Sequence, residues 1–180
     1  INYISYMKNI VLLGATGSIG DSCLNVIRQN KKHFNLLGIG LSRNLDKAKN
    51  IAEEFGPDHI FIAESNFNKS HKLLRSHPGI LTTQQELKQL IQDSEVDIVI
   101  SAISGFAGLQ ASYFAIDAGK TILVANKESI VAAGGILIPL SNAKNSEIIP
   151  VDSEHNAIHQ CLPHERDLDE ISKILITASG

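Results

Sequence analysis

The sequence predicts an α/β protein with a doubly wound, mostly parallel sheet, and two observations lead to that prediction. Short runs of Val, Ile and Leu, uninterrupted by polar residues, are typical of strands buried on both faces of a parallel sheet. Between these runs, apolar residues recur at the spacing of amphipathic helices. Repeated strand–helix units favour right-handed crossovers, which place helices on both faces of one sheet.

The strands are expected where the apolar runs lie, from the amino terminus onward. These runs cover residues 10–13, 36–41, 60–62, 96–100, 121–124, 148–151 and 174–176. We expect the polar stretch 64–83 to hold a surface helix and loops, and the stretch 163–169 to form a solvated connection.

Four of the intervening segments have a clear helical face. Each lies between two expected strands, so each is expected to be a crossover helix. The apolar residues on these faces are Ile19, Cys23, Val26 and Ile27, then Leu45, Ala48, Ala52 and Phe55, then Ala111, Phe114, Ala115 and Ala118, and finally Ala157, Ile158, Cys161 and Leu162.

The composition excludes several classes of protein. A chain of 180 residues allows one domain and part of a second. A net charge of −3 gives no general attraction to nucleic acid or to anionic lipid. Two cysteines, Cys23 and Cys161, are too few for a disulfide framework and are expected to be small buried hydrophobic residues.

The sequence shows neither a membrane-spanning run nor a signal peptide, so a cytoplasmic protein is the expectation. No apolar run approaches the roughly 18 residues that cross a bilayer. Residues 1–6 lack the features of a signal peptide and are expected to be an extension before the first strand.

A glycine-rich turn at residues 14–20 directly follows the first expected strand and opens the first helix. Its spacing, G-x-x-G-x-x-G, is a variant of the dinucleotide-binding fingerprint of Rossmann-type sheets. The helix N-terminus would offer free N–H groups to a pyrophosphate. The alternative is a tight turn without a ligand. The glycines of this turn, Gly14, Gly17 and Gly20, would let the backbone approach the pyrophosphate closely.

The end of the second expected strand favours NADPH over NADH. NAD-binding proteins usually place Asp or Glu there, to hold the ribose 2′-hydroxyl. This chain has Ser42, Arg43 and Asn44 instead, and a cation among small polar residues suits a 2′-phosphate. The alternatives are that Arg43 is a solvated surface residue, and that Asp46 still reaches the ribose.

A second polar turn, residues 125–129, separates the strand at 121–124 from an apolar helix. Ligands of open α/β sheets bind at the carboxyl ends of strands, which is where this turn lies. Lys127 would supply a positive charge for a phosphorylated or enolate-bearing substrate. Asn126 could equally be the N-cap of the helix, and Glu128 a partner of the helix dipole.

Two carboxylates follow the strand at 148–151. Asp152 and Glu154 are two residues apart, so in extended chain both would point to one side. Oxygen ligands of this kind suit Mg²⁺ or Mn²⁺. The alternative is a helix start, with Asp152 as N-cap. His155 and His159 resemble an H-E-x-x-H motif, but Asn156 replaces its Glu, which rejects a metalloprotease.

Taken together, four segments resemble the 1-deoxy-D-xylulose 5-phosphate reductoisomerase family. They are residues 13–20, 125–129, 150–158 and 176–180, in that order, within a resemblance that spans 8–180. The resemblance implies a Rossmann-type NADPH-binding domain over residues 1–149. It also implies that residues 150–180 are the first part of an α+β catalytic and metal-binding domain.

The resemblance implies roles for individual residues. NADPH would contact the glycine turn at Thr16, Gly17, Ser18 and Ile19, then Ser42, Arg43 and Asn44, and also Asn126 and Glu128. Lys127, Asp152 and Glu154 would be catalytic, with Asp152 and Glu154 binding Mg²⁺, Mn²⁺ or Co²⁺. The substrate would contact Lys127, Ser153, Glu154 and Ser179.

The implied activity is the rearrangement and reduction of 1-deoxy-D-xylulose 5-phosphate to 2-C-methyl-D-erythritol 4-phosphate, in isoprenoid biosynthesis, by a homodimer. Ser42 stands where the family often has Gly. A third acidic ligand and a mobile loop are expected beyond Gly180, so these 180 residues are expected to bind NADPH without turnover. The alternatives are another NADP-dependent dehydrogenase, of the semialdehyde or homoserine type, and a non-catalytic dinucleotide sensor.

Overall fold

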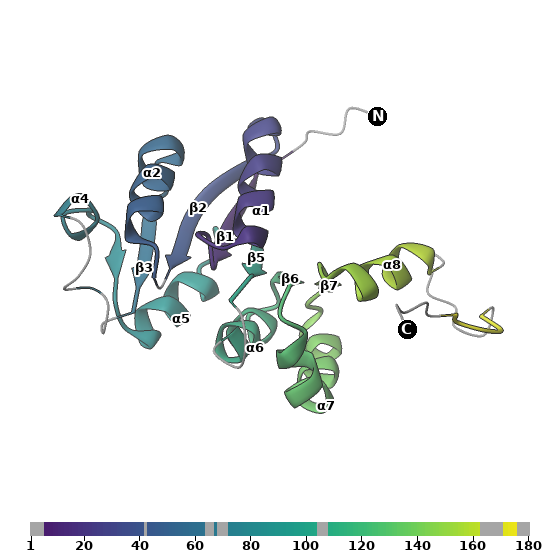
Figure 1. The fold of residues 1–180 in the computed structure, drawn as a ribbon. Helices are drawn as coiled ribbons and strands as arrows, with labels where there is room; N and C mark the ends of the chain where they lie inside the picture. The colour runs from purple at the N-terminus through teal and green to yellow at the C-terminus, as the bar shows by residue number, and fades with distance from the viewer. Residues whose placement is uncertain are drawn as a thin grey trace.

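A computed structural model describes residues 6–41, 43–63, 67, 72–103, 108–162 and 171–175. Within these residues one sheet has seven strands, in the order β4-β3-β2-β1-β5-β6-β7, and every neighbouring pair is parallel (Figure 1). The strands are β1 (Lys8–Leu13), β2 (Phe34–Leu41), β3 (His59–Ile62), β4 (Ile80–Leu81), β5 (Ile98–Ser101), β6 (Thr121–Val124) and β7 (Ile148–Pro150). The predicted doubly wound α/β fold is therefore confirmed.

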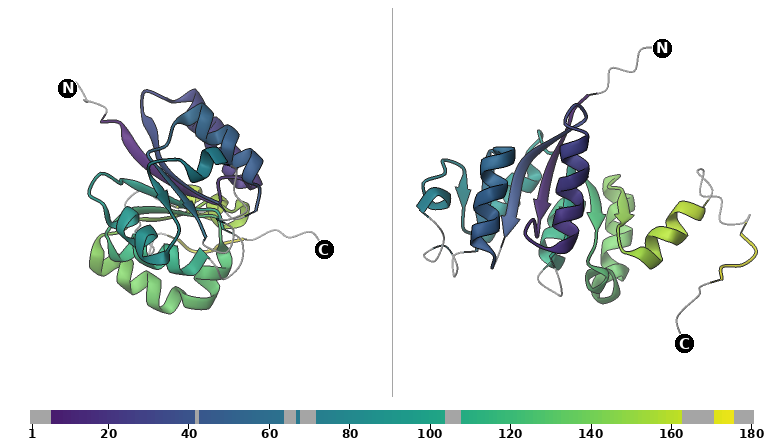
Figure 2. Two further views of the ribbon diagram at one scale, coloured as in Figure 1. Left: turned by 90° about the vertical axis from the view of Figure 1, so that its left-hand side faces the viewer. Right: turned by 45° about the horizontal axis from the view of Figure 1, so that its top comes forward.

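Helices cover both faces of the sheet, as Figure 2 shows from two further directions. Helices α1, α2 and α4 contribute to one apolar cluster, and α5, α6 and α7 to the other. The described helices are α1 (Ser18–Gln29), α2 (Leu45–Phe55), α4 (Lys72–Arg75), α5 (Gln84–Gln92), α6 (Leu109–Asp117), α7 (Lys127–Lys144) and α8 (Ser153–Cys161).

Strand β1 shows why its run is apolar at consecutive positions. Ile10 and Leu12 belong to the cluster under α1 and α2, whereas Val11 and Leu13 belong to the cluster under α5 and α6. All four are nearly or fully buried. Burying each such side chain contributes about 1.5–3 kcal/mol, so β1 anchors both layers of the core.

Helix α5 and strand β4 are the elements that the sequence pattern did not single out. Thr83 and Glu86 form a capping box: the Thr83 hydroxyl accepts from the Glu86 amide at 3.2 Å, and the Glu86 carboxylate accepts from the Thr83 amide at 2.9 Å. These hydrogen bonds, with one from the Thr82 amide, hold the pKa of Glu86 below its ordinary value. Strand β4 is only two residues long, which is too short for a periodic pattern.

Two expectations about apolar residues are wrong, and a third segment is less buried than its pattern suggests. Ile174 and Leu175 lie outside any strand, while Ile176 is not among the described residues. Cys161 is exposed and Cys23 is half-buried. On α1, the buried residues are Gly20, Leu24 and Ile27, whereas Ile19 and Val26 are 37% and 52% exposed. The predicted apolar face of α1 is nevertheless confirmed, because Ile19, Cys23, Val26 and Ile27 all line one cavity beside the sheet.

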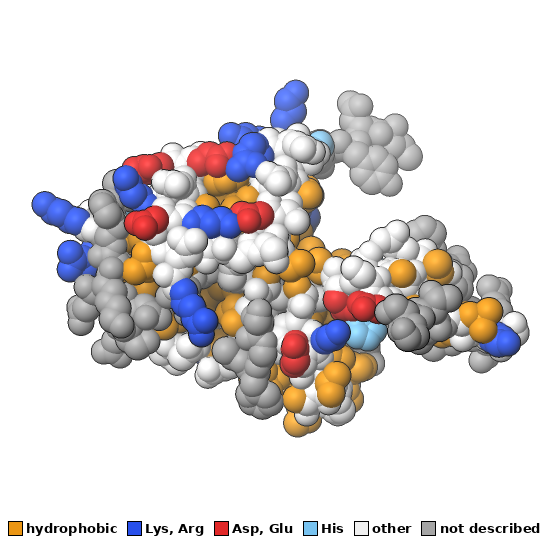
Figure 3. Space-filling view, in the orientation of Figure 1, with side chains coloured by type: hydrophobic (Ala, Val, Ile, Leu, Met, Phe, Trp, Pro, Cys, Tyr) orange, Lys and Arg blue, Asp and Glu red, His pale blue; other side chains and the backbone are white. Residues whose placement is uncertain are grey.

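The partial exposure of this face of α1 has a physical reason in the topology. The chain runs from β5 through α6 to β6 and through α7 to β7, and right-handed crossovers place both helices on the same face. No described helix covers β5 and β6 on the other face. A cavity of about 420 Å³ lies there between α1 and the sheet, lined by Cys23, Val26, Ile100, Leu123 and Val151 among others. We call this cavity the apolar trough, and apolar side chains are visible between α1 and α8 in Figure 3.

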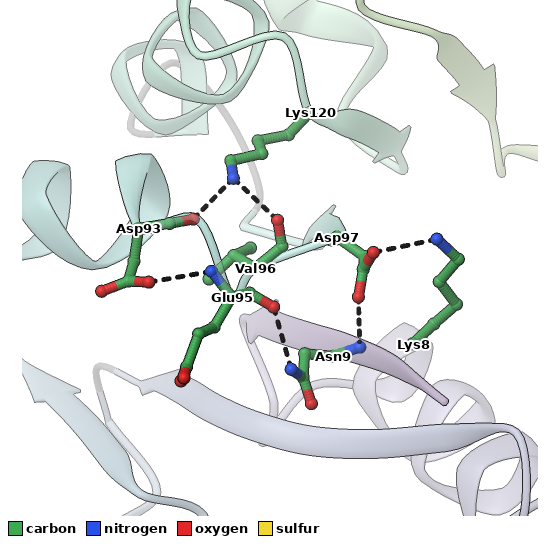
Figure 4. Close-up of polar contacts among 7 residues, drawn as sticks. All are labelled: Lys8, Asn9, Asp93, Glu95, Val96, Asp97 and Lys120. Atoms are coloured by element: carbon green, nitrogen blue, oxygen red, sulfur yellow. Dashed lines mark hydrogen bonds and ion pairs between the residues drawn. The ribbon is translucent and has the colours of Figure 1, made fainter. Parts of the chain in front are cut away.

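The amino-terminal edge of the sheet is held by a network of polar contacts (Figure 4). The Lys120 ammonium group, just before β6, donates to the carbonyl oxygens of Asp93 and Val96 at 2.5 and 2.8 Å. The Asp97 carboxylate accepts from the Lys8 ammonium group and the Asn9 amide, both at 2.9 Å. The network therefore joins the starts of β1, β5 and β6, at the edge opposite the predicted site.

No described helix is both long enough and apolar enough to span a membrane.

Candidate cofactor and metal site

The described residues of the predicted site lie at one edge of the sheet because the strands end in register. Leu13 lies beside Gly40 and Ser101, Ser101 beside Val124, and Val124 beside Pro150. The turns that follow β1, β2, β5, β6 and β7 therefore emerge at one carboxyl edge of the sheet. This is the edge at which open α/β sheets bind ligands.

The glycine turn is held tightly against two neighbouring strands. The Gly14 amide donates to the Gly40 carbonyl oxygen at 2.9 Å, and the Gly17 amide donates to the Gly14 carbonyl oxygen at 3.0 Å. Gly14 has a φ of +87°, and a Cβ built on it would lie 2.3 Å from the Ala102 carbonyl oxygen. Residue 14 must therefore be glycine for the chain to turn here.

This turn fits a pyrophosphate. Gly17 is the N-cap of α1, in extended conformation, and has no side chain that could bond the first amides of the helix. Gly17, Ser18 and Ile19 are exposed, and Thr16 is half-buried. The N-terminal N–H groups of α1 are thus available at the surface, where the helix dipole also favours an anion.

The start of α2 lies next to the glycine turn. Asn44 is the N-cap of α2, and its side-chain oxygen accepts from the Lys47 amide at 3.0 Å. The Lys47 ammonium group donates to the Thr16 carbonyl oxygen at 3.1 Å. Arg43 and Asn44 are exposed, and Ser42 is not among the described residues. Sequence reasoning missed Lys47, since the partners Thr16 and Lys47 are too far apart in sequence for a local pattern.

Asn126 is locked into the turn after β6. Its side chain is 1% exposed, its Nδ2 donates to the Ile103 carbonyl oxygen at 2.7 Å, and its Oδ1 accepts from the Ser129 amide at 3.1 Å. It is therefore the N-cap of α7, one of the two interpretations that the sequence left open. Lys127 and Glu128 are exposed in the first turn of α7.

The structure shows a helix start at the two carboxylates, which is one of the two interpretations that the sequence left open. Asp152 is the N-cap of α8, and Glu154 is exposed in the first helical turn, because α8 begins at Ser153. The Asp152 carboxylate accepts from the His155 amide at 3.1 Å and contacts the His155 Nδ1 at 2.8 Å. Ser153 is exposed beside it, and Ser179 is not among the described residues.

The structure brings Lys127 and Asp152 to the same corner of the sheet. Partial burial alone would raise the pKa of the Asp152 carboxyl, but the hydrogen bonds from His155 and the charge of Lys127 lower it below its ordinary value. Figure 3 shows charged side chains gathered between α7 and α8. Asp152 is therefore ionised at neutral pH.

The donor chemistry of Asp152 and Glu154 fits a hard divalent cation. Their number does not complete a shell, because the described residues contain no group of three or more His, Cys, Asp or Glu side chains that could hold a metal. A cation at Asp152 would also compete with the His155 ring for the same oxygen.

Comparison with known families gives two matches along the chain. The model of 1-deoxy-D-xylulose 5-phosphate reductoisomerase matches residues 10–134. The model of the C-terminal domain of 1-deoxy-D-xylulose 5-phosphate reductoisomerase matches residues 148–180.

Individual relatives agree with these matches. The 1-deoxy-D-xylulose 5-phosphate reductoisomerase of Francisella tularensis subsp. novicida is 43% identical over 173 residues, which are 95% of this chain and 45% of that protein. A crystal structure of DOX-P reductoisomerase with NADPH, fosmidomycin and magnesium is 39% identical, with a TM-score of 0.83, over 88% of this chain and 40% of that one. The enzyme of Zymomonas mobilis in complex with NADPH is 35% identical, with a TM-score of 0.81, over 89% of this chain and 43% of that one. The chain thus spans less than half the length of these relatives.

Proposed function

This chain belongs to the 1-deoxy-D-xylulose 5-phosphate reductoisomerase family, and we propose that it forms the NADPH-binding part of such an enzyme together with its first metal-binding residues. The whole enzyme would convert 1-deoxy-D-xylulose 5-phosphate into 2-C-methyl-D-erythritol 4-phosphate, acting in the cytoplasm as a homodimer. The observation that supports this most strongly is the glycine turn, whose Gly14 leaves no room for a side chain beside Ala102. Family membership favours this function over a semialdehyde or homoserine dehydrogenase and over a dinucleotide sensor.

The cofactor would lie across the carboxyl edge of the sheet. The first-turn amides of α1 would bind its pyrophosphate, with Gly14, Thr16, Gly17, Ser18 and Ile19 forming the turn. Ser42, Arg43 and Asn44 would surround the 2′-phosphate, to which Arg43 supplies a positive charge. Asn126 would act by holding the turn before α7 in place, because its side chain is already bonded to Ile103 and Ser129.

The substrate and the metal would lie at the corner between α7 and α8. When bound, NADPH supplies a hydride and the divalent cation stabilises negative charge on substrate oxygens. Asp152 is ionised at neutral pH and can ligate Mg²⁺, Mn²⁺ or Co²⁺ without losing a proton first. Lys127 would attract and orient the phosphorylated sugar, and Ser153, Glu154 and Ser179 would complete its contacts.

We propose a domain boundary between residues 149 and 150, near the end of β7 (Ile148–Pro150). β7 is the last strand of the sheet, and within the described residues α8 has no buried side chain. Residues 1–149 would then form the NADPH-binding domain, and residues 150–180 the first part of the catalytic domain.

Nucleotide affinity tests the cofactor assignment. This chain is titrated with NADPH and with NADH, and binding is measured by isothermal titration calorimetry. NADPH is expected to bind more tightly. Arg43→Ala should remove most of that preference. Arg75→Ala, which removes an exposed cation from α4, is the matched control and should leave both affinities unchanged. Equal affinity of the unchanged chain for NADPH and NADH would contradict the proposal.

A further inference from the structure

Lys47 links the glycine turn to the segment after β2, which are the predicted pyrophosphate and 2′-phosphate ends of the cofactor site. Its ammonium group donates to the Thr16 carbonyl oxygen at 3.1 Å and to the Asp21 carboxylate at 2.6 Å. Its backbone amide donates to the side chain of Asn44 at 3.0 Å. One residue of α2 therefore contacts the glycine turn, the first turn of α1 and the residue that follows Arg43.

The position of this cation is unusual for helix α2. Lys47 lies in the first turn of the helix, where the dipole favours acidic side chains and disfavours an ammonium group. Asp21 compensates for this locally by pairing with Lys47. A lysine in an unfavourable place, directed at a backbone carbonyl of the glycine turn, suggests a role outside the stability of α2.

The pairing with Asp21 can be exchanged at little cost. The side chains of Lys47 and Asp21 are 30% and 51% exposed, so water screens their attraction. Ion pairs of this kind contribute at most about 1 kcal/mol. A phosphate dianion, which has a higher charge and three acceptor oxygens, would compete well with a single carboxylate for the ammonium group.

We propose that Lys47 is a specificity residue for the 2′-phosphate of NADPH, acting with Arg43, and that Asp21 holds its ammonium group until the cofactor binds. This inference rests on the proposed function, since it adds a residue to the same nucleotide site. The ligand group that it recognises is a phosphate monoester on the adenosine ribose.

The test compares two nucleotides that differ in that phosphate. This chain and its variants are titrated by calorimetry with 2′,5′-ADP, which has the 2′-phosphate, and with 5′-AMP, which lacks it. Lys47→Ala is expected to weaken 2′,5′-ADP binding about tenfold and to leave 5′-AMP binding within about twofold. Lys47→Arg should retain most of the affinity for 2′,5′-ADP, because the positive charge is kept.

Two further variants test whether the effect is specific to Lys47 and whether the Asp21 carboxylate competes for its ammonium group. Lys49→Ala removes a lysine from the same helix, where Lys49 pairs with Glu53 at 3.6 Å, and should leave both affinities unchanged. Asp21→Asn removes the competing carboxylate and should strengthen 2′,5′-ADP binding. Thermal unfolding of each variant checks that the fold is intact.

The outcomes distinguish the two proposals. If Lys47→Ala weakens both nucleotides equally, Lys47 only shapes the turn and the inference is wrong. If it weakens neither, Lys47 has no part in binding. If the unchanged chain binds 2′,5′-ADP no more tightly than 5′-AMP, and shows no affinity for NADPH, the proposed function fails as well.

Discussion

The Cα atom of Gly14 faces the carbonyl oxygen of Ala102 so closely that a Cβ on residue 14 would lie 2.3 Å from that oxygen. Gly14 directly follows β1 and Ala102 directly follows β5, so the contact joins the ends of two neighbouring strands at the carboxyl edge. The glycine turn is thereby fixed by the sheet itself.

Gly14→Ala should therefore damage both stability and cofactor binding. The substitution adds a steric clash to a left-handed backbone, and we expect it to cost about 3 kcal/mol of the free energy of unfolding. Urea unfolding and NADPH titration measure the two effects. Gly56→Ala is the control, because Gly56 also has a positive φ (+58°) but no atom lies within 4 Å of its built Cβ. It should cost about 1 kcal/mol and leave NADPH binding intact. Equal losses from both substitutions would show that the contact with Ala102 is unimportant.

Asn126→Asp should destabilise the turn before α7. Aspartate keeps the N-cap but replaces the Nδ2 donor by a second oxygen, which would face the Ile103 carbonyl oxygen in a buried place. We expect a loss of about 2–3 kcal/mol in the free energy of unfolding, measured with urea. Asn44→Asp changes the exposed N-cap of α2 in the same way and should cost less than about 0.5 kcal/mol. A harmless Asn126→Asp would mean that the Ile103 hydrogen bond contributes nothing.

Asp97 should make the protein sensitive to acid. Partial burial alone would raise the pKa of Asp97, but the hydrogen bonds from Lys8 and the Asn9 amide lower it below the ordinary value of 3.8. The unfolded chain therefore takes up this proton first. The stabilisation is complete above pH 3.8 and is lost as the pH falls through the lower folded-state pKa.

Asp97→Asn should flatten the acid limb of a plot of unfolding free energy against pH, measured with urea at pH values from about 5 down to about 2. Lys8→Met should give an intermediate slope, because the Asn9 amide still bonds the carboxylate. An unchanged slope in Asp97→Asn would refute this role of Asp97.

Asp152→Asn should weaken binding of Mn²⁺. Asparagine is as good an N-cap as aspartate, so α8 should remain folded while one anionic ligand is lost. With only two carboxylates, the unchanged chain is expected to bind Mn²⁺ with a Kd of about 10⁻³ M, and the variant more weakly. Electron paramagnetic resonance of free Mn²⁺ measures both. Asp58→Asn, an exposed acid beside β3, is the control. If Asp152→Asn and Asp58→Asn bind Mn²⁺ alike, Asp152 is not a ligand.

The sequence pattern predicted the sheet well because its strands are buried on both faces. Residues such as Val11 and Leu12 face different helix layers, so every position of the strand must be apolar. The glycine turn could be located for a similar reason, since the restriction on Gly14 is local. Helix α5 was missed although Thr83 and Glu86 have the spacing of a capping box.

Other features depend on contacts between distant residues. The exposure of Val26 on α1 could not be predicted, because Val26 borders the apolar trough, and only the order of the strands determines where the sheet lacks a covering helix. The direction of Glu154 depends on where α8 begins, and spacing alone fitted both extended and helical chain. The contact of Lys47 with Thr16 joins residues 31 positions apart.

The apolar trough allows the solubility of the protein to be changed with little effect on its folding stability. Val26 is half exposed, so replacing it by lysine should lower the free energy of unfolding only slightly. The substitution also adds a positive charge to an apolar surface. Such a variant should be more soluble than the unchanged chain, because the added charge shields exposed apolar side chains without any change at the glycine turn.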